Sequence, residues 1–109
     1  NNFRITANTG YLYFADATAN QTRATMNNAG TWSFNGSLNP GSNNTYDLGS
    51  TSLRWRNVYT NDLNLSNEGN SNDVDGTWGN YTIQEGEDDL FLINRRSGKK
   101  YKFNLTEVS

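Results

Sequence analysis

Cysteine and histidine are absent from this chain of 109 residues. Without Cys the chain has neither a disulfide framework nor a zinc site built from thiolates. Without His it lacks the commonest metal ligand and the side chain that most often serves as a general base near neutral pH. These absences exclude stabilisation by disulfides or thiolate-bound zinc, and catalysis that depends on a His base.

Apolar residues are also scarce, at 33% of the chain, whereas globular chains usually have about 45–50% on a count that includes Gly. A chain of this length is one domain or a piece of one, and a small domain buries only about 60–70% of its unfolded surface. Yet 13% of the residues are aromatic, with three Trp, six Tyr and five Phe. Disordered segments have few aromatics, so we expect a folded chain that buries these rings.

Charge and hydropathy exclude two kinds of partner. The net charge of −2 gives no basic field to displace counterions, so we expect no nucleic acid. No apolar run approaches the roughly 18 residues of a membrane-spanning helix, so we expect no membrane insertion. The chain begins Asn-Asn-Phe-Arg, without an initiating Met or a signal peptide's apolar region, and we expect it to be part of a longer protein.

Short extended runs between clusters of Asn, Ser, Thr and Gly predict an all-β fold of antiparallel strands and hairpins. The predicted strands are residues 3–6, 11–15, 22–26, 31–35, 53–60, 62–66, 78–84, 90–94 and 100–106. Asn-Asn-Ala-Gly after Met26 and Ser97-Gly98 predict hairpin bends. Residues 67–76 are too polar to pack and predict an exposed loop.

The only Pro, Pro40, lies in a stretch of turn-forming residues that divides the chain. We expect a β-hairpin segment at residues 1–36, a connector at 37–45 and a C-terminal β module at 46–109 that ends in a hairpin.

Alternating apolar residues identify the candidate buried positions. From residue 53 onward the two-residue period of a strand puts large side chains on one face, and the predicted strand at 90–94 is apolar on both faces, which implies cover from a neighbour as well as from its own chain. Burying one Trp or Tyr face contributes about 2–3 kcal/mol. Because one chain has too little apolar material, we expect an obligate oligomer, with these residues in its core: Leu53, Trp55, Tyr59, Leu63, Phe91, Ile93, Tyr101 and Phe103.

Charged residues are segregated along the second half of the chain. Residues 62–89 carry only acids, namely Asp62, Glu68, Asp73, Asp75, Glu85, Glu87, Asp88 and Asp89. Residues 95–102 carry only bases, namely Arg95, Arg96, Lys99, Lys100 and Lys102. The acidic segment of one subunit could meet the basic turn of another and set their register. Alternatively, both are solvated turns whose ion pairs contribute about 0–1 kcal/mol.

The acidic residues suggest two chemical functions. The carboxylates of residues 85–89 could serve glycoside hydrolysis, but nothing apolar beside them would separate their pKa values, and we predict no enzyme activity. Asp73, Asp75 and Gly76 match the start of a calcium loop, whereas the twelfth position is Gln84 in place of Glu. This partial motif leaves calcium binding undecided, and we assign neither a metal site nor a cofactor.

Four aromatics fall outside any clear alternating pattern: Tyr11, Tyr13, Trp78 and Tyr81. Exposed rings beside Asn and Asp could bind sugars, with the rings stacked on the apolar sugar faces. Aromatics are equally enriched in subunit interfaces. We favour the interface for these four residues and keep them as candidate receptor contacts.

One segment of the chain consists of Tyr-Asp-Leu-Gly-Ser, then Arg54-Trp55, then Val58-Tyr59-Thr60. The Gly-Ser-Leu-Asn-Pro connector lies before it and the run from residue 89 to 106 after it. Together these residues resemble the tail fibres and tailspikes of bacteriophages. The resemblance covers roughly residue 36 to the end. It departs from the family where the chain stops without the self-cleaving chaperone region.

This resemblance implies an elongated, intertwined homotrimer in a virion appendage, with other tail proteins and a host-surface glycan as further partners. The implied function is structural and adhesive, in host attachment. The alternatives are a carbohydrate-binding receptor tip and a non-catalytic fragment of a glycan depolymerase.

Overall fold

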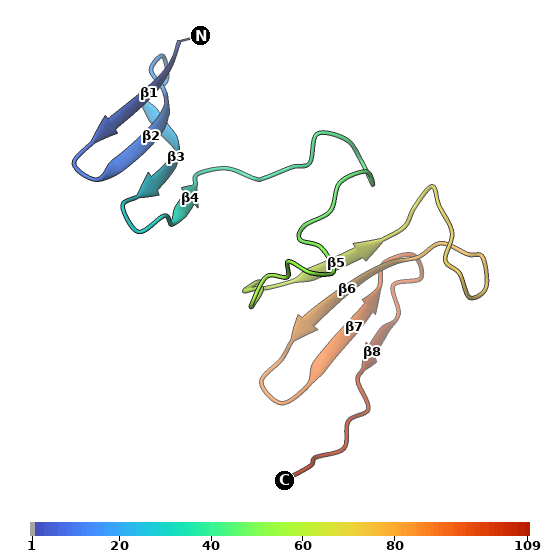
Figure 1. The fold of residues 1–109 in the computed structure, drawn as a ribbon. Coiled ribbons are helices and arrows are strands. Elements are labelled where there is room, and N and C mark those ends of the chain that lie inside the picture. The colour runs from blue at the N-terminus through green and yellow to red at the C-terminus, as the bar shows by residue number, and fades with distance from the viewer. Residues whose placement is uncertain (1) are drawn as a thin grey trace. The chain divides into compact units, whose positions relative to one another are not determined.

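The structure, a computed structural model, describes residues 2–109, and it is all-β. Eight strands form two antiparallel sheets of four, each with its strands in chain order (Figure 1). The chain divides into two compact units, Asn1–Ser52 and Leu53–Ser109, and each unit carries one sheet. The predicted fold class and antiparallel hairpins are confirmed.

The first sheet is a meander with tight turns. Thr9 and Gly10 both have positive φ, at 50° and 81°, as required by the two-residue turn whose twist matches the flanking strands. The predicted bend after Met26 is confirmed, because Gly30 has a φ of 84° and the amide of Gly30 donates to the carbonyl of Asn27 at 3.0 Å. The strands are β1 (Phe3–Asn8), β2 (Tyr11–Asp16), β3 (Gln21–Asn27) and β4 (Trp32–Phe34).

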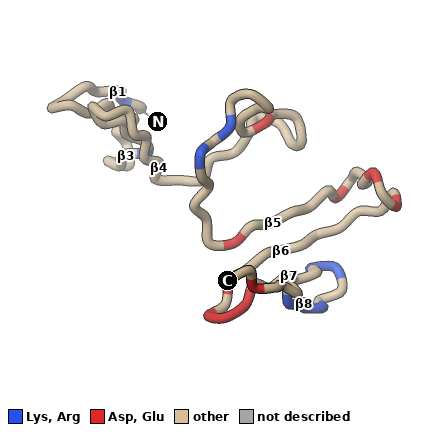
Figure 2. The backbone as a smooth tube through the Cα atoms, turned by 60° about the horizontal axis from the view of Figure 1, so that its bottom comes forward, with Lys and Arg blue, Asp and Glu red and all other residues tan. Residues whose placement is uncertain are grey.

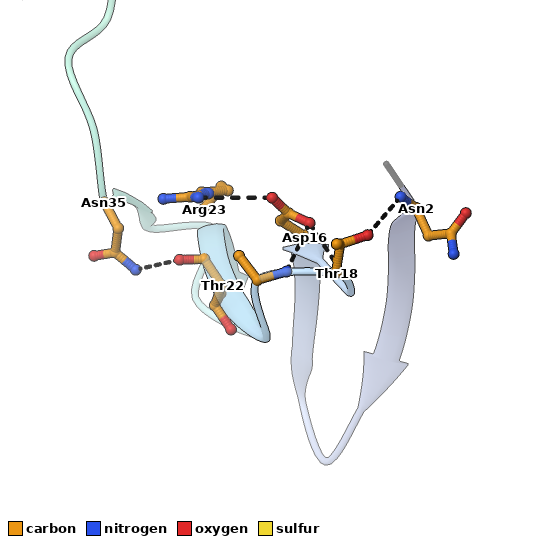
Figure 3. A network of polar contacts seen from close by, with 7 residues as sticks. Asn2, Asp16, Thr18, Thr22, Arg23 and Asn35 are labelled. Carbon is orange, nitrogen blue, oxygen red and sulfur yellow. Dashed lines mark hydrogen bonds and ion pairs between the residues drawn. The ribbon is translucent and has the colours of Figure 1, made fainter.

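Polar side chains fix the turn between β2 and β3 (Figure 3). The Oδ1 atom of Asp16 accepts hydrogen bonds from the amides of Thr18 at 3.0 Å and Ala19 at 3.1 Å, and Oδ2 lies 3.7 Å from a guanidinium nitrogen of Arg23. The pairing of β2 with β3 shifts register beside this turn, between Phe14 and Ala15. Asp16 thus holds the backbone at an irregular point of the sheet.

One face of the first sheet is apolar and consists of a single layer. Ile5, Phe14, Ala24 and Phe34 are paired across the four strands, and paired residues share a face. The rings of Phe14 and Trp32 lie 5.7 Å apart on it, yet Trp32 is 46% exposed. The aromatic side chains contact one another within this face but are not covered.

The second sheet is also a meander, and its strands are β5 (Leu63–Ser66), β6 (Asn80–Glu85), β7 (Leu90–Asn94) and β8 (Lys100–Lys102). Gly98 in the β7–β8 turn has a φ of 77°, which confirms the predicted bend. The loop between β5 and β6 is exposed over residues 68–77. Every contact between strands of this unit joins neighbours in the sheet, so no described strand packs across either face.

The predicted strand at residues 53–60 is wrong. This segment is irregular, as are all residues between β4 and β5, and Tyr59 is 91% exposed. An alternating pattern shows that a segment suits a sheet, but a strand also needs a neighbour for its backbone groups, and no described strand pairs with this one. The strand predicted at 100–106 ends at Lys102, although the amide of Phe103 still donates to the carbonyl of Leu90 at 3.0 Å.

Candidate functional site

The second sheet has one apolar face. Leu63, Ile83, Leu92 and Tyr101 form a directly paired row across its four strands. Alternation along each strand adds further side chains to the same side. We define the apolar face as Leu63, Leu65, Tyr81, Ile83, Leu90, Leu92, Tyr101 and Phe103. Leu65 is 50% and Tyr101 48% exposed, so this face lies open in the single chain.

The opposite face is polar and is completed by its own side chains. Thr82 is the fully buried side chain of the described residues, and Ile93, its partner on β7, is 8% exposed. The hydroxyl of Thr82 donates to Oδ1 of Asn64 at 2.6 Å and accepts from Nε of Arg95 at 3.0 Å. This face therefore needs no other molecule to satisfy its buried polar atoms.

The predicted core residues divide among several places. Leu63, Tyr101 and Phe103 meet on the apolar face, whereas Phe91 and Ile93 lie on the polar face. Ile93 is buried and Phe103 half-buried. The other six are exposed in the single chain, namely Leu53, Trp55, Tyr59, Leu63, Phe91 and Tyr101. The burial of these six in an oligomer stays a prediction.

Sequence reasoning missed four members of the apolar face, Leu65, Ile83, Leu90 and Leu92, and took a fifth, Tyr81, as a receptor contact. The alternation of Leu63 with Leu65 and of Tyr81 with Ile83 could have identified two of them. Leu92 lies on the face of β7 opposite Phe91 and Ile93, and the sequence did not show that this face also carries Leu63 and Tyr101.

An open groove of about 460 Å³ lies beside the β5–β6 loop. Its lining is Leu65, Ser66, Asn67, Asn72, Asp75, Thr77, Trp78, Gly79 and Tyr81. Two of the predicted receptor contacts, Trp78 and Tyr81, thus lie in one groove. The other two, Tyr11 and Tyr13, belong to the first sheet, where their rings are 5.8 Å apart.

Hydrogen bonds within the loop shape the polar side of this groove. Asn72 Oδ1 accepts from the amides of Val74 and Asp75, at 2.7 and 2.9 Å. Asp75 Oδ1 accepts from the hydroxyl of Thr77 at 2.7 Å and from Nδ2 of Asn72 at 2.8 Å. The bond from Thr77 and then that from Asn72 lower the pKa of Asp75 below its ordinary value of 3.8. The groove therefore carries an ionised carboxylate near neutral pH.

Arg96 fixes the aromatic side of the groove. Its guanidinium carbon lies 3.8 Å from the centre of the Trp78 ring, within the range of a cation–π contact. The same guanidinium donates to the backbone carbonyl of Trp78 at 3.0 Å. Arg96 is not part of the groove lining, so it holds the indole from outside the groove.

Within residues 2–109, no group of three or more His, Cys, Asp and Glu side chains is arranged to hold a metal ion. Over the same residues no helix is long and apolar enough to cross a membrane.

No protein-family model matches this chain, and no curated protein or solved structure matches it.

Proposed function

We propose that this chain is a structural and adhesive module of a bacteriophage tail fibre or tailspike and works as a homotrimer on the virion. In this proposal the two sheets provide the hydrogen-bonded scaffold, and the exposed apolar residues form the contacts between subunits. The trimer contributes to attachment at the bacterial surface.

The observation that supports self-association is the small apolar core. Among the described residues the buried hydrophobic side chains are Ala15 and Ile93. The second sheet, in contrast, leaves the apolar face open. At about 25 cal/mol per Å² of apolar area, covering such a face would stabilise the assembly considerably. A surface of this kind typically marks an interaction site.

The resemblance to phage fibres supports a phage virion as the particle to which this chain belongs. It rests on Tyr-Asp-Leu-Gly-Ser, Arg54-Trp55 and Val58-Tyr59-Thr60. Residues 53–60 lie outside every strand in the single chain, and Trp55 is 65% exposed. An intertwined trimer would give this segment strand partners from other subunits.

A binding assay tests the adhesive part of the proposal. The labelled chain is incubated with intact bacteria and with their purified surface polysaccharides, and its trimeric state is checked by light scattering. We expect trimers that bind a subset of strains and compete with phage particles for those strains. Trimers that bind none of the strains across a broad panel would contradict the adhesive role.

The groove beside Trp78 supports a second candidate function, a carbohydrate-binding receptor tip. It combines a fixed indole, the Tyr81 ring, and the amide and carboxylate of Asn72 and Asp75. Rings that stack on sugar faces and acceptors for hydroxyl groups are what a glycan site requires. A glycan array tests this function, with Trp78→Ala as the groove variant and Trp32→Ala, in the first sheet, as the control. Binding that Trp32→Ala retains and Trp78→Ala loses would support it, and equal loss would contradict it.

A further inference from the structure

We propose that copies of this chain dock head to tail through the second sheet, so that the acidic turn of one copy lies against the basic turn of the next. The acidic turn is residues 85–89, with Glu85, Glu87, Asp88 and Asp89. The basic turn is residues 95–100, with Arg95, Arg96, Lys99 and Lys100. The docking surface is the apolar face, and the arrangement rests on the self-association proposed above.

The two turns lie at opposite ends of the sheet (Figure 2). Asp89 precedes β7 and Arg95 follows it, so the six steps between them span about 20 Å of extended chain. This distance is twice the roughly 10 Å over which charges act at 0.1 M salt. The described residues contain one ion pair, between Asp16 and Arg23 in the other unit. The acidic turn therefore has no ion-pair partner within its own sheet.

The other charged residues near each end do not remove this separation of an acidic end from a basic end. Asp62 immediately precedes β5 and adds an acid at the acidic end, where Lys102 is the nearby base. At the basic end the β5–β6 loop carries Glu68, Asp73 and Asp75. None of these three lies within ion-pair distance of a base of the described chain, and the Asp75 carboxylate is already bonded to Asn72 and Thr77.

Two bases of the turn remain available to a neighbour. Arg95 bonds Thr82 and Arg96 stacks on Trp78, so both serve their own chain. Lys99 and Lys100 are exposed, and their side chains have no hydrogen bond or ion pair in the described structure. On the acidic side Glu87 and Asp88 are exposed in the same way. Lys100 is paired with Ile93 and so lies on the polar side at the end of the sheet, whereas Lys99, Glu87 and Asp88 lie outside the strands. All four side chains can meet the end of a second sheet without breaking a contact of the fold.

Symmetry then decides how the copies are oriented. If the rotation axis ran along the strands, identical turns would gather at one end and repel each other. If the axis crosses the strands, the acidic end of one sheet follows the basic end of the next, and the contact closes into a ring. In that ring every apolar face can turn toward the axis. Charge complementarity and apolar burial are both satisfied only when the axis crosses the strands.

Charge reversal in the chain of 109 residues tests the contact. The acid-reversed variant is Glu87→Lys with Asp88→Lys, the base-reversed variant is Lys99→Glu with Lys100→Glu, and the fourfold variant carries all four. The control is Glu68→Lys with Asp73→Lys, which changes the net charge as the acid-reversed variant does but lies in the β5–β6 loop. Sedimentation equilibrium at low and high salt gives the dissociation constant of each, and circular dichroism verifies that each is folded.

We expect each reversed variant to dissociate about tenfold more readily than the original chain at low salt, because complementary charges become like charges. The fourfold variant should return to within about twofold of the original, since the pairs are rebuilt with opposite signs. The control should not dissociate more readily, and high salt should reduce all the differences.

Two results would overturn the head-to-tail contact while leaving the trimer intact. One is that the original chain assembles and neither the acid-reversed nor the base-reversed variant has a different dissociation constant. The other is a fourfold variant that dissociates more than either reversed variant. A chain that never assembles would instead contradict the proposed function, so the two failures are distinct.

Discussion

The Nε atom of Arg95 donates a hydrogen bond of 3.0 Å to the hydroxyl of Thr82, the fully buried side chain of the described residues. The hydroxyl of Thr82 in turn donates to Oδ1 of Asn64 at 2.6 Å. These two hydrogen bonds join the turn after β7 to β6 and β5. The polar face of the second sheet is thus completed by its own residues. The apolar face on the other side is not.

Replacing Arg95 tests the completed face. Arg95→Ala removes a charged donor from a buried hydroxyl, and such a bond contributes about 1.5–3 kcal/mol. We expect the free energy of unfolding to fall by that order, measured in urea at one fixed protein concentration because assembly also adds stability. Arg4→Ala, at an exposed Arg of β1, is the control and should change the value by less than about 0.5 kcal/mol. Equal effects of the two substitutions would contradict the role of Arg95.

A pair of adjacent substitutions tests the open face. Leu63 and Asn64 are neighbours on β5 with side chains on opposite faces. Leu63→Asp places a charge on the apolar face, where covering a Leu contributes about 1.5–3 kcal/mol, so we expect the dissociation constant of the assembly to rise more than about tenfold. Asn64→Asp keeps an acceptor for Thr82 and should leave assembly unchanged. Size-exclusion chromatography over a dilution series distinguishes the two.

Trp55 tests the irregular segment. Because Trp55 lies outside the strands and is 65% exposed, the sheets of a single chain do not depend on it. We expect Trp55→Ala to weaken assembly by about 2–3 kcal/mol while the β-sheet signal in circular dichroism persists. Val74→Ala, at another exposed apolar residue, is the control. A Trp55→Ala chain that assembles as the original does would remove this segment from the interface.

Asp75 makes the β5–β6 loop sensitive to acid. Its pKa is lowered by the hydrogen bonds from Thr77 and Asn72, so the stabilisation of the loop is present above the ordinary pKa of 3.8. It is lost as the pH falls through the lower pKa of the folded state. We expect the amide resonance of Thr77 to shift in NMR spectra only below pH 3.8. In Asp75→Asn this acid transition should be absent, and a transition that persists there would assign it to another group.

The strands were largely predictable because local patterns determine them. The prediction for β7 matches the structure at both ends, since an apolar run lies between Asp89 and the turn residues around Gly98. The segment at 53–60 has an equally good alternation, but no strand of the same chain pairs with it. Propensity is local, whereas pairing requires a second segment whose position the sequence does not give.

The candidate site was predictable in part. The predicted receptor contacts Trp78 and Tyr81 both line the groove, although Tyr81 also belongs to the apolar face. Thr82 was not recognised, because a Thr in a strand is typical of a solvated face. Its hydroxyl accepts a hydrogen bond from Arg95, which comes thirteen positions later in the sequence. The composition of the apolar face likewise depends on the register across the β7–β8 turn.

Sedimentation equilibrium of the full chain at micromolar concentration tests self-association most directly. The account predicts a species of three times the 12.2 kDa chain mass. When that species dissociates, the apolar face should become exposed to solvent. A compact 12.2 kDa species that unfolds cooperatively at the same concentration would contradict it, because a single chain would then be stable with its apolar face uncovered.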